Sequence, residues 1–266
     1  MKNVLLLVHD DAGQEARLQV ALDITRAIRG HLTCLDVAIM VQIAGDYDGV
    51  CGALLLDDER TRESANRLAL EARLDAEAIG YTWVDAVGTL ASCVRDAARL
   101  ADLIVLNRRL DSFHSSDLQQ AIGEIIVKSG TAVVAVPERA RAFAAGGNAL
   151  VAWNGSLAAI AALRAAVPLL ALARTVTLLT VQDRAPAAAP GEAAAYLARH
   201  NIAPLTATVV ADGRSVADAL LAEIAARDAG YLVMGGFGHS RLREAIFGGV
   251  TRQMLESCPV PLVLAH

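Results

Sequence analysis

Four glycines near the C-terminal end of the chain have the spacing of a phosphate-binding site. Gly235 and Gly238 enclose two residues, and nine more separate Gly238 from the run Gly248-Gly249-Val250-Thr251. Glycine lets the main chain approach a phosphate closely, and a helix start adds free N–H donors and a partial positive charge. The chain contains no G-K-[ST] sequence, which rules out a Walker loop. Residues 235–251 therefore predict a phosphate cradle without a lysine.

The elements around this cradle place it at the edge of a parallel sheet. An aliphatic strand is expected at 231–234 and a helix at 250–256, so the glycines follow the carboxyl end of a strand, where such sheets bind ligands. Another strand of the same half ends at Trp153-Asn154, on the same edge. We expect the Asn154 amide to reach a base or sugar, and Ser156 to cap the next helix.

Short aliphatic runs alternate with amphipathic segments along the whole chain, which indicates βαβ crossovers and parallel sheets covered on both faces. The expected strands are at 4–8, 32–39, 82–87, 103–106, 131–136, 150–153, 176–181, 206–210, 231–234 and 260–264. The expected helices are at 14–28, 60–79, 90–100, 117–128, 156–172, 191–200, 215–227 and 250–256.

The two halves repeat the same order of elements. At an offset of 128 residues, the strand at 103–106 falls on the strand at 231–234, and Ser129 falls on Ser257 without a gap. Duplication of one domain explains this. We expect domains at 1–138 and 149–266, joined by a short flexible linker at 139–148 that is rich in Ala and Gly.

Composition limits the class of protein. The 266 residues suit two domains, and 55% hydrophobic content with only 4% aromatic residues predicts aliphatic cores. The net charge of −5 argues against bulk nucleic-acid binding, and the apolar runs are too short to span a membrane. Four scattered cysteines without a C-x-x-C pair, and no signal peptide at the start, favour a reduced cytoplasmic setting.

The first half lacks the cradle. At the same offset, the four glycines 235, 238, 248 and 249 correspond to Asn107, Leu110, Gln120 and Ala121, whose Cβ atoms oppose close approach and positive φ. We expect the N-terminal half to bind no nucleotide in this way, even though Asp10 ends its first strand.

The chain resembles the universal stress protein family in its tandem two-domain form, over both halves and above all in the motif Gly235-x2-Gly238-x9-Gly248. The resemblance implies an α/β fold with two open, Rossmann-like parallel sheets of five strands each. The domains would form an internal pseudo-dimer in which the strands at 131–136 and 260–264 pair. It also implies ATP binding, with contacts from Ala152, Asn154, Val181, Met234, Gly235, Gly238, Gly248, Gly249, Val250 and Thr251.

Two positions depart from the family pattern. Gly249 stands where ATP-binding relatives have Ser or Thr, and losing one hydroxyl contact costs roughly 1 kcal/mol, about fivefold in affinity. Asn154 stands where the family has Asp, which removes a charge and adds a donor, so the preference for a particular base stays open.

Other candidate sites have weaker patterns. His9-Asp10-Asp11 suggests a metal corner but lacks further ligands, so we interpret it as a turn at a strand end. The segment 45–49 is similar to part of a calcium loop without its final Glu. His239-Ser240-Arg241 is either a flap over the phosphate or a solvated loop. No metal ligand set and no catalytic residue is predicted.

Three function classes follow. We expect foremost a cytoplasmic stress-response regulator that binds ATP or a related adenine nucleotide in its C-terminal domain, with or without Mg²⁺ or another divalent cation. At most it would hydrolyse ATP slowly, since no general base lies beside the cradle. A scaffold that acts through protein–protein surfaces of the pseudo-dimer is the alternative. An adenylating enzyme or flavin carrier is a third, for which residues 153–156 form no pyrophosphate loop. The protein partner and any homodimer stay open.

Overall fold

The structure is a computed structural model that describes residues 1–39, 49–108, 117–183, 189–237 and 249–266. The N-terminal half contains β1 (Asn3–Val8), α1 (Gln14–Ile28), β2 (His31–Ile39), α2 (Gly49–Ala76), β3 (Tyr81–Gly88), α3 (Leu90–Ala97), the 3₁₀ turn η1 (Ala98–Leu100), β4 (Leu103–Asn107), α4 (Asp117–Lys128) and β5 (Ala132–Val136). The C-terminal half contains β6 (Asn148–Ala152), α5 (Leu157–Leu170), β7 (Thr175–Gln182), α6 (Gly191–Arg199), β8 (Leu205–Val210), α7 (Val216–Ala226), β9 (Ala229–Gly235), α8 (Gly249–Ser257) and β10 (Leu262–Ala265).

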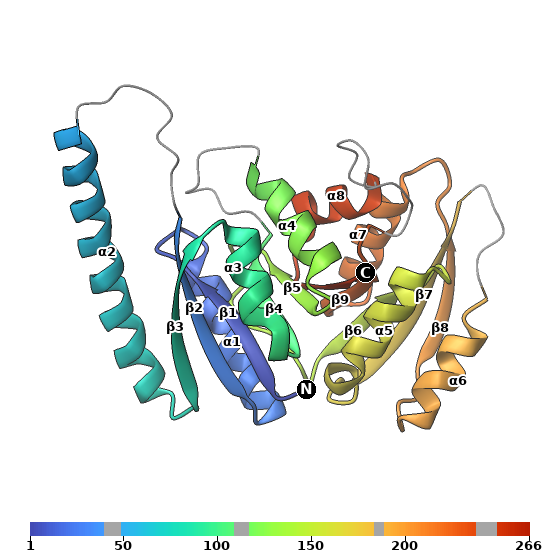
Figure 1. The fold of residues 1–266 in the computed structure, drawn as a ribbon. Helices are drawn as coiled ribbons and strands as arrows, with labels where there is room; N and C mark the ends of the chain where they lie inside the picture. The colour runs from blue at the N-terminus through green and yellow to red at the C-terminus, as the bar shows by residue number, and fades with distance from the viewer. Residues whose placement is uncertain (40–48, 109–116, 184–188, 238–248) are drawn as a thin grey trace.

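The described strands form one ten-stranded sheet in the order β3-β2-β1-β4-β5-β10-β9-β6-β7-β8. Strands are parallel within each half, and the two halves meet where β5 and β10 pair antiparallel, with Val134 opposite Val263. The predicted α/β fold with two five-stranded parallel sheets is confirmed, and so is the pairing of the last strands of the two halves within one chain. Figure 1 shows the halves side by side around this central pair of strands.

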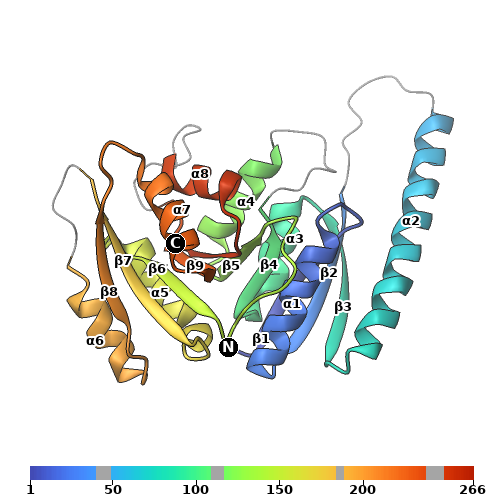
Figure 2. The same ribbon diagram turned by 180° about the vertical axis from the view of Figure 1, so that it is seen from behind.

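Helices cover both faces of the sheet, which explains why the central strands β1, β4, β5 and β10 are buried along almost their whole length, whereas the edge strands β3 and β8 are partly exposed. One buried cluster joins the sheet to α1, α2, α5 and α6, and a second joins its other face to α3, α4, α7 and α8. Figure 2 shows the same arrangement from behind. Aliphatic residues dominate both clusters, as the composition predicted.

Side-chain caps start several helices where the sequence places Ser or Thr. The Ser156 hydroxyl accepts the Ala159 N–H (3.2 Å), and the Ser215 hydroxyl accepts the Asp218 N–H (3.0 Å). Each cap satisfies one of the N–H groups that the first helical turn leaves unpaired. The predicted Ser156 cap is confirmed.

Two predictions about connecting segments are wrong. Helix α2 begins at Gly49 and not near residue 60, because Ala53 and the three leucines after it are good helix formers that continue the helix toward Gly49. The segment 139–148 is not a free linker. Phe143 is buried (4% exposed), its ring stacks on Tyr231 at 4.7 Å between centroids, and its N–H donates to Asp23 Oδ2 (2.8 Å).

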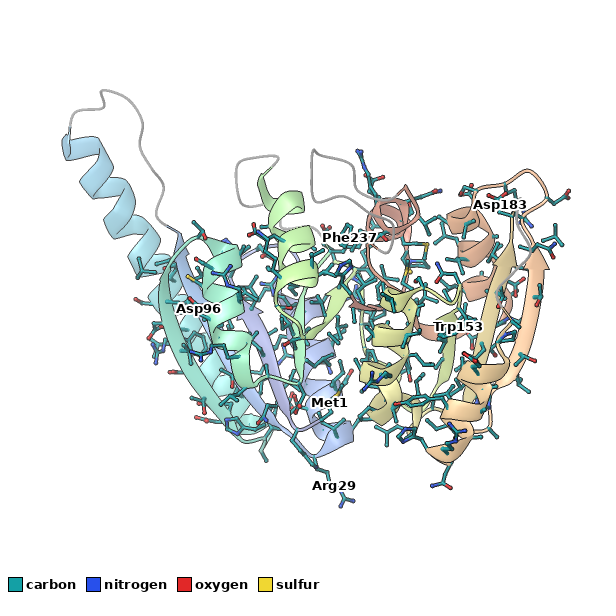
Figure 3. All side chains as sticks on the ribbon, turned by 45° about the vertical axis from the view of Figure 1, so that its right-hand side comes forward. Met1, Arg29, Asp96, Trp153, Asp183 and Phe237 are labelled. Carbon is teal, nitrogen blue, oxygen red and sulfur yellow. The ribbon has the colours of Figure 1, made fainter. Side chains whose placement is uncertain are left out.

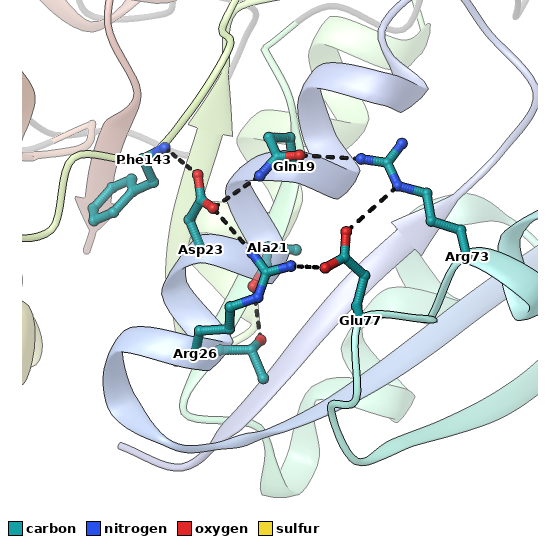
Figure 4. A network of polar contacts seen from close by, with 8 residues as sticks. Gln19, Ala21, Asp23, Arg26, Arg73, Glu77 and Phe143 are labelled. Atoms are coloured by element: carbon teal, nitrogen blue, oxygen red, sulfur yellow. Dashed lines mark hydrogen bonds and ion pairs between the residues drawn. The ribbon is translucent and has the colours of Figure 1, made fainter. Parts of the chain in front are cut away.

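Figure 4 shows how this connection is tied to helices of the first half. The Asp23 carboxylate on α1 accepts the Phe143 N–H and pairs with Arg26 (3.3 Å), which in turn contacts Glu77 just beyond α2. Burying one aromatic ring offsets the entropy of ordering the segment, which Ala and Gly alone would leave loose. The connection is therefore part of the core between the two halves.

Candidate functional site

Three neighbouring strands of the C-terminal half, β9, β6 and β7, end along one edge of the sheet. Ala152 closes β6, Val181 lies next to the end of β7, and Met234 lies next to the end of β9. Met234 is buried at 5% exposure, whereas Ala152 and Val181 are half-buried. The parallel order therefore brings these predicted residues to one edge, although they are far apart in the sequence.

Gly235, the last residue of β9, is required by the packing of the protein itself. A Cβ at Gly235 would lie 2.6 Å from the Ala159 nitrogen and 2.7 Å from the Ala158 carbonyl carbon. Both are main-chain atoms in the first turn of α5, which cannot move without moving the helix. This glycine lets the N-terminus of α5 approach the end of β9.

The two residues after β9 are held in a defined conformation. The Gly236 N–H donates to the Ala265 carbonyl (2.8 Å), and its carbonyl is 3.0 Å from His266 Nδ1. Phe237, labelled in Figure 3, has a φ of +58°, a conformation that costs an aromatic residue of order 1–3 kcal/mol. Its N–H donates to Thr251 Oγ1 (3.2 Å), which ties the end of β9 to the first turn of α8.

The first residues of α8 belong to the predicted cradle. Gly249 is exposed, and a Cβ placed on it would meet no atom of the described residues within 4 Å, so packing within the described part of the chain does not account for this glycine. Val250 is half-buried, and Thr251 is 5% exposed. The Thr251 oxygen accepts the Phe237 N–H, while its hydroxyl proton is a further donor.

Asn154 lies exposed beyond β6, on the same edge. Its Oδ1 accepts the Ser156 N–H (3.1 Å), so the carbonyl side of the amide helps to start α5. The NH₂ group is then the part of this side chain that is suited to a ligand, and it recognises acceptors rather than donors. Gly238, Gly248 and the segment His239-Ser240-Arg241 lie outside the described residues.

Residues 147–266 match the model described as the Universal stress protein family. The C-terminal half is a universal stress protein domain. A universal stress protein from Archaeoglobus fulgidus DSM 4304 has a similar structure over 99% of this chain and 95% of its own, with a TM-score of 0.77 and 15% sequence identity. The whole chain therefore has the same fold as that protein.

Two proteins from Pseudomonas aeruginosa have similar folds. A putative universal stress protein from strain UCBPP-PA14 gives a TM-score of 0.59 at 14% identity, over 100% of this chain and 93% of its own. A protein of unknown function from strain PAO1 gives 0.62 at 14% identity, over 100% and 92%. No curated protein matches the sequence.

In the N-terminal half, side chains fill the edge that corresponds to the cradle of the universal stress protein domain. Asn107 ends β4 where Gly235 ends β9, and it is fully buried. Its Oδ1 accepts from Arg17 Nη1, and its Nδ2 lies 1.7 Å from where a Cβ of Gly13 would be. The two halves thus use glycine on opposite sides of the same contact: Gly235 in the strand of one, Gly13 before the helix of the other.

Arg17 completes this closure. Its guanidinium is fully buried, pairs with Asp11 (3.1 Å) and donates to the His9 carbonyl (3.0 Å). Burial lowers the pKa of Arg17, and the Asp11 carboxylate opposes that shift. Asp11 also accepts the Gly13 N–H (2.7 Å), so the predicted turn at 9–11 is confirmed. In this half, which was predicted to lack a glycine cradle, a charged network occupies the strand ends.

The sequence analysis missed four residues at these edges. Arg17 carries a signal, because it lies three, four and seven residues before the apolar Val20, Ala21 and Ile24 on one face of α1. Phe237, Arg108 and Ile126 were not predicted either. Arg108 and Ile126 belong to the first half and contact the second. Arg108 falls on Gly236 at the 128-residue offset, but nothing in the sequence shows that its side chain crosses between the halves.

The described residues lack the features of several other kinds of site. None of the described helices is both long enough and apolar enough to cross a membrane. Within the same residues, no three His, Cys, Asp or Glu side chains gather as metal ligands. Cys34, Cys93 and Cys258 are buried free thiols, and burial raises the pKa of Cys34 to about 12.

Proposed function

We propose that this protein is a cytoplasmic stress-response regulator that binds one ATP or related adenine nucleotide per chain, in its C-terminal half. The observation that carries the proposal is the start of α8, where Gly249 is exposed, a Cβ on it would contact none of the described residues, and Thr251 Oγ1 accepts the Phe237 N–H. Main-chain N–H groups at a helix start bind phosphate through hydrogen bonds and the helix dipole. The family of the C-terminal half supports the same ligand.

The residues around the start of α8 have side chains and main-chain groups of the types that bind a nucleotide. Gly235, Gly249, Val250 and Thr251 would hold the phosphates, together with Gly238 and Gly248. Ala152, Val181 and Met234 would line the base and sugar with apolar atoms, and the Asn154 NH₂ would contact an acceptor there. A divalent cation would bind through the phosphates.

The regulatory step would be a linkage. A nucleotide that favours one arrangement of residues 236–249 would change the surface that a partner protein meets, by as much as its affinity differs between arrangements. Hydrolysis is at most slow in this proposal, because the described residues place no carboxylate beside the cradle, and the nearby His266 imidazole is engaged with the Gly236 carbonyl through Nδ1 (3.0 Å).

Thermal unfolding with a series of ligands tests the proposal. ATP at 100 times its Kd stabilises the folded protein by about 2.7 kcal/mol, which raises the Tm by roughly 5–10 °C for a chain of this size. A phosphate cradle predicts the affinity order ATP, ADP, AMP, with adenosine weakest. Titration calorimetry should give one site per chain, because the Arg17 network closes the other half. An unchanged Tm at millimolar ATP would refute the proposal.

The scaffold hypothesis makes the opposite prediction for protein purified from cells. Acid extraction followed by mass spectrometry should release an adenine nucleotide in near-equal amount if the cradle is functional. An empty site both after purification and after titration would favour a scaffold that acts through its surfaces.

A further inference from the structure

In addition to the β5–β10 pairing, the two halves contact each other at two points that involve the elements of the predicted cradle. The first point is Arg108, which directly follows β4. Its N–H donates to the Val136 carbonyl (3.0 Å), and its Nη1 donates to the Cys258 carbonyl (3.0 Å). Cys258 directly follows the last residue of α8, Ser257. A cation of the N-terminal half therefore donates a hydrogen bond at the C-terminal end of α8, the helix whose start belongs to the cradle.

The second point lies under Gly236. A Cβ on Gly236 would be 3.0 Å from Ile126 Cγ2, so the main chain of the cradle packs closely on α4 of the N-terminal half. Ile126 is buried at 1% exposure, and the Gly236 N–H is held by Ala265 in β10. The end of β9 thus rests on the first half as well as on its own strands.

Helix α8 lacks a cation of its own at this end. Its last turn contains no basic residue, although cations near the last carbonyls of a helix stabilise it. The sequence places Arg108 opposite Gly236 at the 128-residue offset, so the contact runs in one direction only. The first half has the arginine, and the second half has the glycine that packs closely on Ile126 of α4.

We propose that Arg108 is a positioning residue for the nucleotide site of the opposite half, fixing α8 so that its first N–H groups point to the phosphates. This inference rests on the proposed function. Helix α8 has nine residues and a length of roughly 13 Å, so it moves as a rigid rod, and holding one end defines the direction of the other. The N-terminal half is then not merely a closed copy. It holds α8, and with it the start of the helix that belongs to the cradle, in position.

Calorimetric titration of three variants tests this role. Arg108→Ala should bind ATP about fivefold more weakly, because the cradle N–H groups lose their alignment, and should bind adenosine as the wild type does. Arg108→Lys, which keeps a cationic donor for the Cys258 carbonyl, should restore most of the ATP affinity. A loss that affects ATP and adenosine equally would overturn the proposal, because a general loss of structure has no preference for phosphate.

Lys2→Ala is the matched control. The Lys2 ammonium donates to the carbonyls of Ile28 and Arg29 at the end of α1, so it makes the same kind of contact far from the cradle in the sequence. This variant should bind ATP as tightly as the wild type. Equal losses in Lys2→Ala and Arg108→Ala would overturn the proposal.

Hydrogen exchange in the protein without nucleotide gives a readout that does not depend on binding. Amides of α8 should exchange about fivefold faster in Arg108→Ala than in the wild type, and those of α5 should be unchanged. Unchanged α8 exchange would overturn the proposal. If the alanine variant does not fold, Arg108→Gln replaces it in both measurements. Wild-type protein that binds no ATP would refute the proposed function, whereas wild-type binding with an unaffected Arg108→Ala would refute the positioning role alone.

Discussion

At the scale of single residues, glycines that share one motif have different physical roles. Gly235 is needed because main-chain atoms of Ala158 and Ala159 lie where its side chain would be. A Cβ on Gly249 would meet no atom of the described residues within 4 Å, so its small size is not required by their packing. A motif with fixed spacing predicts both residues equally well, and only the surroundings separate the structural glycine from the one open to phosphate.

Gly249→Ser should strengthen ATP binding about fivefold, because it supplies the phosphate-directed hydroxyl that relatives have at this position. The new Cβ would displace none of the described residues, because none lies within 4 Å of it. Calorimetric titration with ATP measures the effect, and the affinity for adenosine should not change.

Gly191→Ser is the control for this variant. Gly191 is also the first residue of a helix, α6, and a Cβ there would likewise meet no atom within 4 Å. Serine at a helix start can stabilise the helix by itself, so both variants share that effect. Tighter ATP binding by both, or by neither, would contradict the role assigned to Gly249.

At the scale of elements, strands that pair in the sheet are also linked at their ends by side chains. Asp102, just before β4, accepts the N–H groups of Lys2 and Asn3 at the start of β1 (2.9 Å from Asn3 N). Partial burial would raise the pKa of the Asp102 carboxyl, but these two N–H donors and the N-terminal charge outweigh burial, and the pKa lies below its usual value. The ionised carboxylate therefore stabilises the pairing of β1 with β4.

This lowered pKa predicts how stability depends on pH. A carboxyl with a depressed pKa in the folded state contributes its stability above the unfolded value near 4, and the contribution is lost as pH falls through the folded pKa. Asp102→Asn should therefore have a lower Tm than the wild type at pH 7. The difference in Tm between the two proteins should become smaller as pH falls from 5 to 3. The effect is small, about 1 kcal/mol or less, because the carboxylate is exposed.

Asp96→Asn serves for comparison in this series. The Asp96 side chain is 75% exposed. Among the described residues, its only ion pair is with the neighbouring Arg95, at 3.9 Å. Its Tm should follow that of the wild type across the same pH range. A constant difference between Asp102→Asn and the wild type at all pH values would argue against the ionised form as the stabilising one.

At the scale of the whole molecule, two half-sheets become one structure through the β5–β10 pair and the packed connection between them. Phe143 from that connection stacks on Tyr231 in β9, while its N–H reaches Asp23 in α1. Burial raises the pKa of the Tyr231 phenol, whose hydroxyl donates to the Leu169 carbonyl (3.2 Å). The connection thus joins a helix of the first half to the core of the second.

Phe143→Ala should destabilise the protein by about 3–5 kcal/mol, because it leaves a cavity beside the Tyr231 ring. Unfolding in urea measures the loss. Leu100→Ala is the control, since Leu100 is 88% exposed and its removal should change stability by no more than about 0.5 kcal/mol. Equal stability of the two variants would mean that the connection is not part of the core.

The sequence by itself determined the order of strands and helices, the parallel strands within each half and the edge of the sheet where Ala152, Val181, Met234 and Gly235 lie. These follow from local periodicity, from the 128-residue offset, and from the rule that parallel strands end together. The start of α2 escaped prediction because Gly49 and Gly52 suggest a loop, while the leucines between Gly52 and Asp57 extend the helix.

Only the tertiary structure decided which side chains occupy those edges. The Arg17–Asn107 contact, the packing of Phe143 on Tyr231 and the grip of Arg108 on the Cys258 carbonyl each join residues far apart in the sequence. Local preferences carry no information about such pairs, because their energy depends on distance and burial after the sheet has formed. In the first half Asn107 and Arg17 fill the end of β4, whereas in the second half Gly235 lets α5 approach the end of β9, and that difference arises from contacts in space.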